Sequence, residues 1–241
     1  MTMRRLILWA ILAHVVGAGL IAWPFWGGRI AQVVGWRSSS GSSQGWLEAR
    51  GEYGEVPDFS LIERSGRRVT RADLLGRVWI ANLIYTECKE TCPLQSARMA
   101  RLQGEFAGEE DLRLVSITVD PEHDAPAILA RYAGRYGADA VRWLFLTGEK
   151  RAIYHLASEG FRLGVVDPDD RAQGEGRLGL VGPQPAFATH GSKGLVIHSS
   201  RFVLVDRQAR IRAYHLPDDE QSLDRLRQNV RILLREKPKA R

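Results

Sequence analysis

Apolar runs alternate with helix-spaced segments through the middle of the 241-residue chain. The run Val78–Tyr85 (VWIANLIY) is almost continuously apolar, which is typical of a central strand buried on both faces. Pro93 suits the first turn of a following helix. The pattern predicts, in order, strand Val78–Tyr85, helix Pro93–Phe106, strand Leu112–Val119, helix Asp124–Tyr136 with Asp124 as its N-cap, strand Trp143–Thr147 and helix Glu149–Ser158.

The second half of the chain begins with a long segment of different composition. Residues 164–194 are rich in Gly, Pro, Asp and Gln and show little periodicity, and loops of that length tend to be functional. Strand patterns return at Leu195–Val205 and Arg210–His215, and a last helix over Asp218–Arg235 carries one apolar stripe. This order predicts an α/β protein with a thioredoxin-like fold, in which helices flank a mixed central sheet.

An apolar run without a formally charged side chain lies near the N-terminus. Leu6–Trp26 has 21 residues, which at about 1.5 Å per residue span a roughly 30 Å hydrocarbon core. We expect an uncleaved transmembrane helix, and a signal peptide cleaved after Val16-Gly17-Ala18 is the alternative; either exports the rest of the chain. The predicted organisation is a membrane anchor (or signal segment) over 1–28, a flexible linker over 29–52 and a thioredoxin-like domain over 53–241.

The net charge of +6 and the pI near 9.6 raise the question of a nucleic-acid partner. The basic excess lies at the two ends of the chain, because residues 51–206 hold 19 basic and 22 acidic side chains. A phosphate-binding surface on the domain is therefore not supported, and we expect no nucleic-acid partner.

The two cysteines of the chain stand four residues apart at a junction between a strand and a helix. The segment Cys88-Lys89-Glu90-Thr91-Cys92-Pro93 follows the strongest strand signal. Backbone N–H groups at a helix start stabilise anions, so thiolates are favoured there. Three interpretations remain open: a structural disulfide, a redox dithiol, and a metal site that uses two soft thiolates and a further ligand to hold copper(I) or zinc.

A third ligand would come from one of the six histidines. His198 stands directly after the long insertion, at the front of a predicted strand, and is the first candidate. His190 lies within the insertion and is the second candidate, whereas His123 is a candidate for a neighbouring, non-ligand position. His155 and His215 fit ordinary helix and strand positions.

Taken together, these segments resemble the SCO/SenC family, whose members are membrane-anchored, thioredoxin-fold copper proteins that help to assemble the binuclear copper centre of cytochrome c oxidase. The resemblance covers about residues 55–236 and is carried by Ile84–Pro93, Ser116–Asp124, Trp143–Gly148 and His198–Asp206, in family order. It implies that Cys88, Cys92 and His198 are ligands of copper, Cu(I) or Cu(II).

The same resemblance implies a function and a location. It favours a copper chaperone over an enzyme, one that delivers copper to the copper-bearing subunit of cytochrome c oxidase and has other copper chaperones as further partners. The alternative is a thiol–disulfide oxidoreductase that uses Cys88 and Cys92 to reduce partner cysteines before metallation. The protein would sit in the inner (cytoplasmic) membrane as a single-pass protein through residues 6–26, with its domain on the periplasmic side.

Two positions depart from the family pattern. Lys89 stands where the family usually has Pro after the first cysteine, and Ile197 stands where it usually has Asp before the ligand histidine. A lysine beside Cys88 favours the thiolate, whereas loss of the Asp removes a carboxylate that would tune the metal site.

Overall fold

The computed structural model describes residues 48–166, 189–190, 196–197 and 200–236. Its main sheet has seven strands in the order β10-β9-β3-β4-β5-β1-β2. The three central strands are β3 (Val78–Ile84), β4 (Leu112–Thr118) and β5 (Trp143–Thr147), and neighbouring pairs among them run parallel. All three strands were predicted from their apolar runs, and every residue of β3 is buried.

The outer strands make the sheet mixed. On one side, β9 (Phe202–Val205) runs antiparallel to β3, and β10 (Ile211–His215) runs antiparallel to β9. On the other side, β1 (Ser60–Glu63) runs antiparallel to β5 and to β2 (Arg68–Thr70). The predicted mixed sheet is confirmed, with helices on both of its faces.

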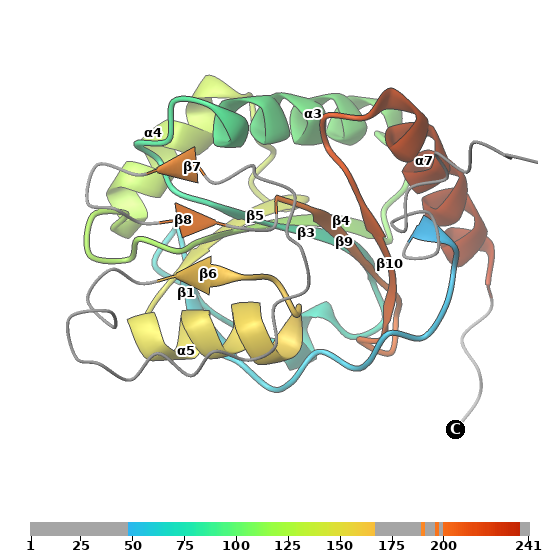
Figure 1. Ribbon diagram of the computed structural model, residues 1–241, viewed down its shortest axis with the longest axis horizontal. Helices are drawn as coiled ribbons and strands as arrows, with labels where there is room; N and C mark the ends of the chain where they lie inside the picture. The colour runs from blue at the N-terminus through green and yellow to red at the C-terminus, as the bar shows by residue number, and fades with distance from the viewer. Residues whose placement is uncertain (1–47, 167–188, 191–195, 198–199, 237–241) are drawn as a thin grey trace, which may run out of the picture. The chain divides into compact units, whose positions relative to one another are not determined.

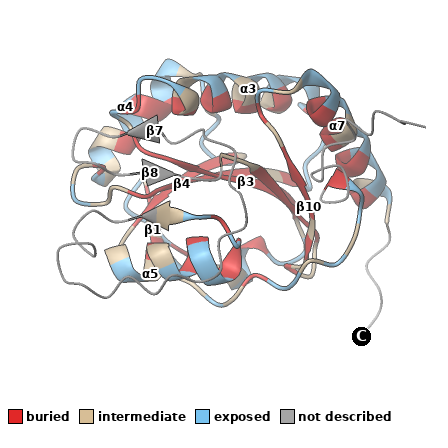
Figure 2. Ribbon diagram, in the orientation of Figure 1, coloured by how far each residue is buried: buried red, intermediate tan, exposed pale blue. Residues whose placement is uncertain are grey.

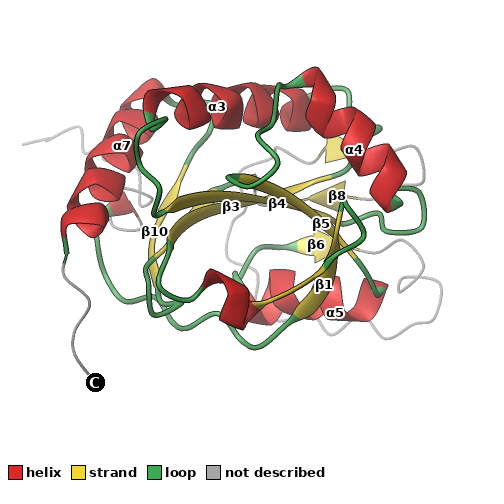
Figure 3. Cartoon of the chain, turned by 180° about the vertical axis from the view of Figure 1, so that it is seen from behind, coloured by secondary structure: helices red, strands yellow, loops and turns green. Residues whose placement is uncertain are grey.

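Figures 1 and 3 show the two helical layers. The helices α3 (Thr91–Glu105), α4 (Pro126–Arg135) and α7 (Glu220–Arg235) lie above the sheet, and α5 (Lys150–His155) lies below it. A short 3-10 helix, η1 (Arg71–Leu74), precedes β3. The predicted helix Glu149–Ser158 is divided, because α5 passes at Leu156 into a π-helical turn, η2 (Leu156–Gly160).

Two predictions about local structure are wrong. The stretch Leu195–Val205 is not one strand: β8 (Val196–Ile197) joins β6 (Val165–Val166) and β7 (Thr189–His190) in a separate three-stranded sheet, whereas β9 joins β3. Asp124 is not the N-cap of α4, because Ala125 holds that position and Pro126 follows it. Asp124 is fully buried and serves the site described below.

The core lies between the sheet and its helices, as Figure 2 shows by the buried colour of the central strands. It also contains a polar chain that crosses three strands. Trp143 Nε1 donates to Ser116 Oγ (3.0 Å), Ser116 Oγ donates to Asn82 Oδ1 (2.8 Å), and Asn82 Nδ2 donates to Gln95 Oε1 on α3 (3.0 Å). Because all four side chains are buried, these bonds fix α3 at one position on the sheet.

Residues 48–52, at the end of the segment expected to be a linker, lie against α7 and β10. The Glu48 carboxylate accepts hydrogen bonds from Ser222 Oγ (2.8 Å) and Arg225 Nε, and the Glu48 carbonyl accepts one from Asn229 Nδ2 (2.9 Å). Asn229 also contacts His215 Nε2 at 3.3 Å. We call Glu48, His215, Ser222, Arg225 and Asn229 the N-terminal cluster.

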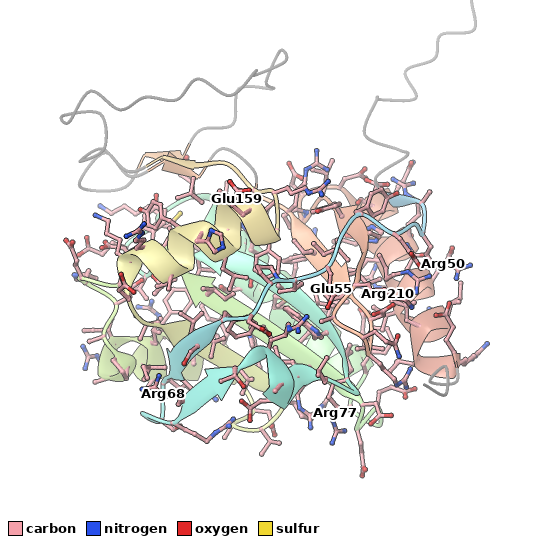
Figure 4. All side chains as sticks on the ribbon, turned by 90° about the horizontal axis from the view of Figure 1, so that it is seen from below. Arg50, Glu55, Arg68, Arg77, Glu159 and Arg210 are labelled. Carbon is pink, nitrogen blue, oxygen red and sulfur yellow. The ribbon has the colours of Figure 1, made fainter. Side chains whose placement is uncertain are left out.

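The chain that follows the N-terminal cluster runs beside β10 and the residues before it. Gly51 N donates to Arg212 O (2.9 Å), and Glu55 forms an isolated bridge with Arg210, the two labelled side by side in Figure 4. The predicted transmembrane helix over residues 6–26 lies outside the described residues. Among the residues that the structure describes, no helix is long and apolar enough to cross a bilayer.

Candidate metal and redox site

Both cysteines lie where β3 leads into α3. We call residues 85–92, between the end of β3 at Ile84 and the second residue of α3, the cysteine turn. Both thiols are free and buried, with 6% of Cys88 and none of Cys92 exposed to solvent. Glu90 stands at the N-cap of α3, but its side chain makes no capping hydrogen bond. The sulfur of Cys88 accepts a hydrogen bond from the Cys92 backbone N–H at 3.4 Å, so Cys88 takes the capping role.

The two thiols have opposite acidities. A hydrogen bond from the Cys92 side chain lowers the pKa of Cys88 to about 5, against the effect of burial and with further help from the backbone N–H groups of Cys92 and Glu90. The pKa of Cys92 is raised, because its thiol donates to Cys88 and is itself buried. At neutral pH, Cys88 is therefore a thiolate that can attack a disulfide or bind a soft metal ion, and Cys92 holds the proton.

A buried carboxylate holds the cysteine turn against the next strand. Asp124 accepts hydrogen bonds from the Thr86 backbone N–H (3.0 Å), the Thr86 hydroxyl and the Thr118 hydroxyl at the end of β4. Desolvation raises the pKa of Asp124 despite these bonds. The sequence does not reveal this role, since an Asp before a helix gives the same local pattern whether it caps the helix or contacts a distant loop.

A cavity of about 500 Å³ opens beside Cys88. Its far wall comes from the end of α4 and the residue after it, so the cavity joins two segments that are about 40 residues apart in the sequence. Arg135 stacks over the ring of Tyr132 at 4.8 Å, and Tyr132 bonds to Ser96 of α3 through its hydroxyl (2.8 Å). The lining residues are Thr86, Glu87, Cys88, Lys89, Pro93, Tyr132, Arg135 and Tyr136.

The histidines divide into those that the structure places and those that it does not. His198 lies outside the described residues, and for His190 only the backbone, in β7, is described. His123 lies beside the cysteine turn, with Nε2 3.5 Å from Glu87 Oε1. His155 is exposed on α5, and His215 is buried in the N-terminal cluster. Within the described residues, no group of three or more His, Cys, Asp or Glu side chains is placed to hold a metal ion.

The described part of the site thus supplies two sulfur donors. Thiolates select copper(I), zinc and other soft or borderline ions over magnesium or calcium. Two sulfurs four residues apart also fit a reversible disulfide, so the residues present suit both metal binding and redox chemistry. A third His, Cys, Asp or Glu ligand from this chain would come from outside the described residues.

Comparisons with known proteins show which proteins this chain is similar to. The sequence profile of the SCO1/SenC family matches residues 48–234. The SCO1 protein homolog of Bacillus subtilis (strain 168) is 35% identical over 133 residues, which cover 54% of this chain and 69% of that protein.

Solved structures agree with the sequence comparison. BsSco, a member of the Sco family of cytochrome c oxidase assembly proteins in which a disulfide switch was identified, is similar with a TM-score of 0.60 and 25% identity, over 79% of this chain and 99% of that one. Arabidopsis thaliana ScoI, solved with copper bound, is similar with a TM-score of 0.56 and 21% identity, over 74% of this chain and 99% of that one. At 21% identity, the likeness to Arabidopsis thaliana ScoI shows a shared fold.

Proposed function

Because this chain belongs to the SCO1/SenC family, we propose that it is a membrane-anchored copper chaperone that delivers copper to the binuclear copper centre of cytochrome c oxidase. Copper is the cargo rather than a resident cofactor. The observation that carries the proposal is the pair of adjacent free sulfurs at the start of α3, one of them a thiolate at neutral pH. A copper-bound relative of the same fold supports the choice of metal.

Cys88, Cys92 and His198 are the proposed ligands. The reach of the chain supports His198 as the third. Strand β9 begins at Phe202 and runs antiparallel to β3, so it starts near the end of the sheet where β3 leads into the cysteine turn. His198 precedes Phe202 by four residues, and four residues of chain span at most about 14 Å.

The two thiols give a route for loading and release. Cys88 offers an ionised sulfur, whereas Cys92 must lose its proton to bind, because the pKa of Cys92 is raised. Metal binding therefore releases a proton from Cys92, and return of that proton weakens one ligand when an acceptor thiolate competes for the ion. Oxidation of the pair to a disulfide would remove both sulfur ligands.

We place the protein in the inner membrane, anchored by residues 6–26, with its domain on the periplasmic side. The uncharged length of Leu6–Trp26 supports the anchor. The proposed partners are the copper-bearing subunit of the oxidase and other copper chaperones.

A copper titration tests the ligand set. The fragment lacking residues 1–45, which leaves the compact unit Trp46–Arg241, is titrated with Cu(I) and Cu(II) as wild type, as His198→Ala and as His155→Ala. We expect His198→Ala to weaken copper binding at least tenfold and His155→Ala, on the exposed face of α5, to leave it unchanged. Equal affinity of all three proteins would remove His198 from the site.

A second candidate function is thiol–disulfide exchange that reduces partner cysteines before metallation. The observation that favours it is the asymmetry of the pair, since an ionised Cys88 beside a protonated Cys92 is the arrangement of an attacking and a resolving thiol. The disulfide switch identified in BsSco supports reversible oxidation in a relative.

The reduction potential of the Cys88–Cys92 pair tests this second function. Equilibration with glutathione buffers, followed by mass measurement after alkylation, gives the potential directly. A potential too high to reduce the disulfide of an isolated copper-bearing subunit would exclude the reductase role and leave the copper role standing. His198→Ala should not change the potential if the two functions share only the cysteines.

A further inference from the structure

The cavity beside Cys88 is lined by several side chains that are not among the proposed copper ligands. Its wall on the α4 side is formed by Tyr132, Arg135 and Tyr136, and Lys89 lies on the turn side. The rings of Tyr132 and Tyr136 are 5.1 Å apart, and Arg135 lies over the first of them. Tyrosine and arginine, with tryptophan, are enriched among the side chains that dominate the binding energy of protein interfaces.

The two cations of this cavity have no carboxylate partner among the described residues. Arg135 is exposed, and its guanidinium stacks on the ring of Tyr132. Lys89 is also exposed and makes no ion pair. The one acidic lining residue, Glu87, faces His123 on the opposite loop, with the two side chains 3.5 Å apart. The charge of Arg135 is therefore available to a bound molecule.

Two ordinary explanations account for part of this arrangement. A basic residue in the last turn of a helix interacts favourably with the helix dipole, and Arg135 is in the last turn of α4. A cation could also serve to ionise Cys88, but the leading causes of the lowered Cys88 pKa are hydrogen bonds within the cysteine turn. Neither explanation requires Arg135 to be stacked in a cavity that contains the reactive sulfur, and stacking reduces the rotamer freedom that binding would otherwise cost.

We propose that this cavity is the recognition site for a protein partner whose cysteine is flanked by acidic residues, with Arg135 binding a flanking carboxylate and Tyr136 packing against the segment. The proposal rests on the proposed function, in that the partner is the protein that exchanges copper or electrons with Cys88. The cavity of about 500 Å³ has room for a few residues of extended chain rather than for a whole domain.

The chemistry at this site can be followed without copper. The Cys88 thiolate attacks the sulfur of a partner cysteine held in a disulfide, a Cys88–partner disulfide forms, and the original partner disulfide breaks to release a thiolate with its electron pair. Cys92, after losing its proton, then attacks Cys88, so that the Cys88–Cys92 disulfide forms and the partner leaves as a thiol. The partner is reduced by two electrons and the cysteine pair is oxidised by two.

The test uses the reduced full-length chain and two cysteine peptides of equal length. In one peptide the cysteine is flanked by Asp and Glu, in the other by Asn and Gln, and each cysteine carries a 2-thiopyridyl disulfide whose release is measured by absorbance. At low ionic strength we expect the acidic peptide to react about 3- to 10-fold faster than the amide peptide, because opposite charge raises the encounter rate. Added salt should reduce the preference.

Two matched variants test whether the preference for the acidic peptide comes from the cavity. Arg135→Gln should abolish most of it, whereas Arg131→Gln, an exposed residue of α4 that does not line the cavity, should retain it. Reaction with the uncharged reagent 2,2′-dithiodipyridine should be the same in all proteins, which reports the Cys88 thiolate itself. Equal rates with both peptides in the wild type, or an unchanged preference in Arg135→Gln, would overturn the proposal. A parallel loss of reaction with the uncharged reagent in Arg135→Gln would also overturn it, because Arg135 would then act through the thiolate.

Failure of this proposal and failure of the proposed function give different results. If the wild type binds copper but shows no peptide preference, the copper role stands and the recognition site is wrong. If the preference is present but the same preparation binds no copper, the recognition site stands and the copper role is wrong.

Discussion

The cysteine turn and the N-terminal cluster both bury polar and ionisable groups, but they use those groups differently. In the N-terminal cluster, Glu48 is bound to Ser222 and Arg225 through its carboxylate and to Asn229 through its carbonyl. In the cysteine turn, the hydrogen bonds converge on the sulfur of Cys88, which also borders a cavity. In the N-terminal cluster the polar groups bind one another and stabilise the fold. In the cysteine turn they stabilise a charged sulfur that a partner can reach.

This contrast separates stability from reactivity. Changes in the N-terminal cluster should lower the free energy of unfolding without altering the thiols. Changes in the cysteine turn should alter thiol chemistry more than stability.

The largest expected effect is on thiol reactivity. In Cys88→Ser, alkylation by iodoacetamide at pH 7 should fall by about 100-fold or more, because the remaining thiol, Cys92, is fully buried and has a raised pKa. In the wild type the alkylation rate should be half-maximal near pH 5 and fall about tenfold per pH unit below it, following the pKa of Cys88. Cys92→Ser is the matched control, since it keeps Cys88 and should shift the half-point upward. A half-point near pH 8.5 in the wild type would contradict the description of the cysteine turn.

The next effect is on stability, in the N-terminal cluster. Glu48→Ala should lower the free energy of unfolding by roughly 2 kcal/mol, because the buried hydroxyl of Ser222 and the head group of Arg225 lose their acceptor. Glu52→Ala is the matched control, since that side chain is 66% exposed and its ion pair with Arg210 should contribute less than about 1 kcal/mol. Urea denaturation measures both. Equal stability of the two variants would show that residues near 48 belong to a loose linker.

The pH dependence of stability should come in part from His215. Burial lowers the pKa of His215 to about 3 from 6.5, helped by the nearby charges of Arg225 and Arg201. The unfolded chain then binds the proton more tightly than the folded protein, so stability falls as the pH drops below 6.5. Between pH 7.5 and 5 this group should cost roughly 2 kcal/mol.

The variant His215→Gln should lack that part of the pH dependence, as measured by urea denaturation at several pH values. His155→Gln, at the exposed end of α5, should retain it. If His215→Gln and the wild type lose stability in parallel down to pH 5, the buried histidine is not the origin of the acid sensitivity.

The smallest effect should come from the carboxylate that supports the cysteine turn. Asp124→Ala should cost about 1 to 2 kcal/mol of stability, because Thr86 N–H and the Thr118 hydroxyl lose their acceptor, and it should raise the half-point of Cys88 alkylation. Asp124→Asn keeps one acceptor oxygen and should behave closer to the wild type. An unchanged alkylation profile in Asp124→Ala would mean that the cysteine turn keeps its geometry without this contact.

The same contrast explains what the sequence could predict. Strands such as Val78–Ile84 and Trp143–Thr147 are visible because burial on both faces demands a continuous apolar run. The cysteine pair is visible because both sulfurs come from one short segment. The bond between Glu48 and Arg225 leaves no local pattern, since 177 residues separate the two, and the cavity wall formed by Arg135 and Tyr136 depends on how α4 packs beside α3.

The pairing of other strands could not be predicted from the sequence, for a related reason. Leu195–Val205 has the composition of one strand, but its two ends pair with different partners, and pairing is set by the tertiary fold. The short strand β1 carries exposed and polar positions and becomes a strand because β2 and β5 pair with it. Position 198 was predicted as a ligand and stays a prediction, because it lies outside the described residues.

Copper binding by the cysteine pair tests the central claim most directly. The reduced unit Trp46–Arg241 is mixed anaerobically with Cu(I) and a competing chelator, and the copper retained per chain is measured for the wild type, Cys88→Ser and Cys92→Ser. We predict stoichiometric copper on the wild type, none on either variant, and none on the wild type after oxidation to the disulfide. Stoichiometric copper on either serine variant would contradict the assignment of Cys88 and Cys92 to one copper site.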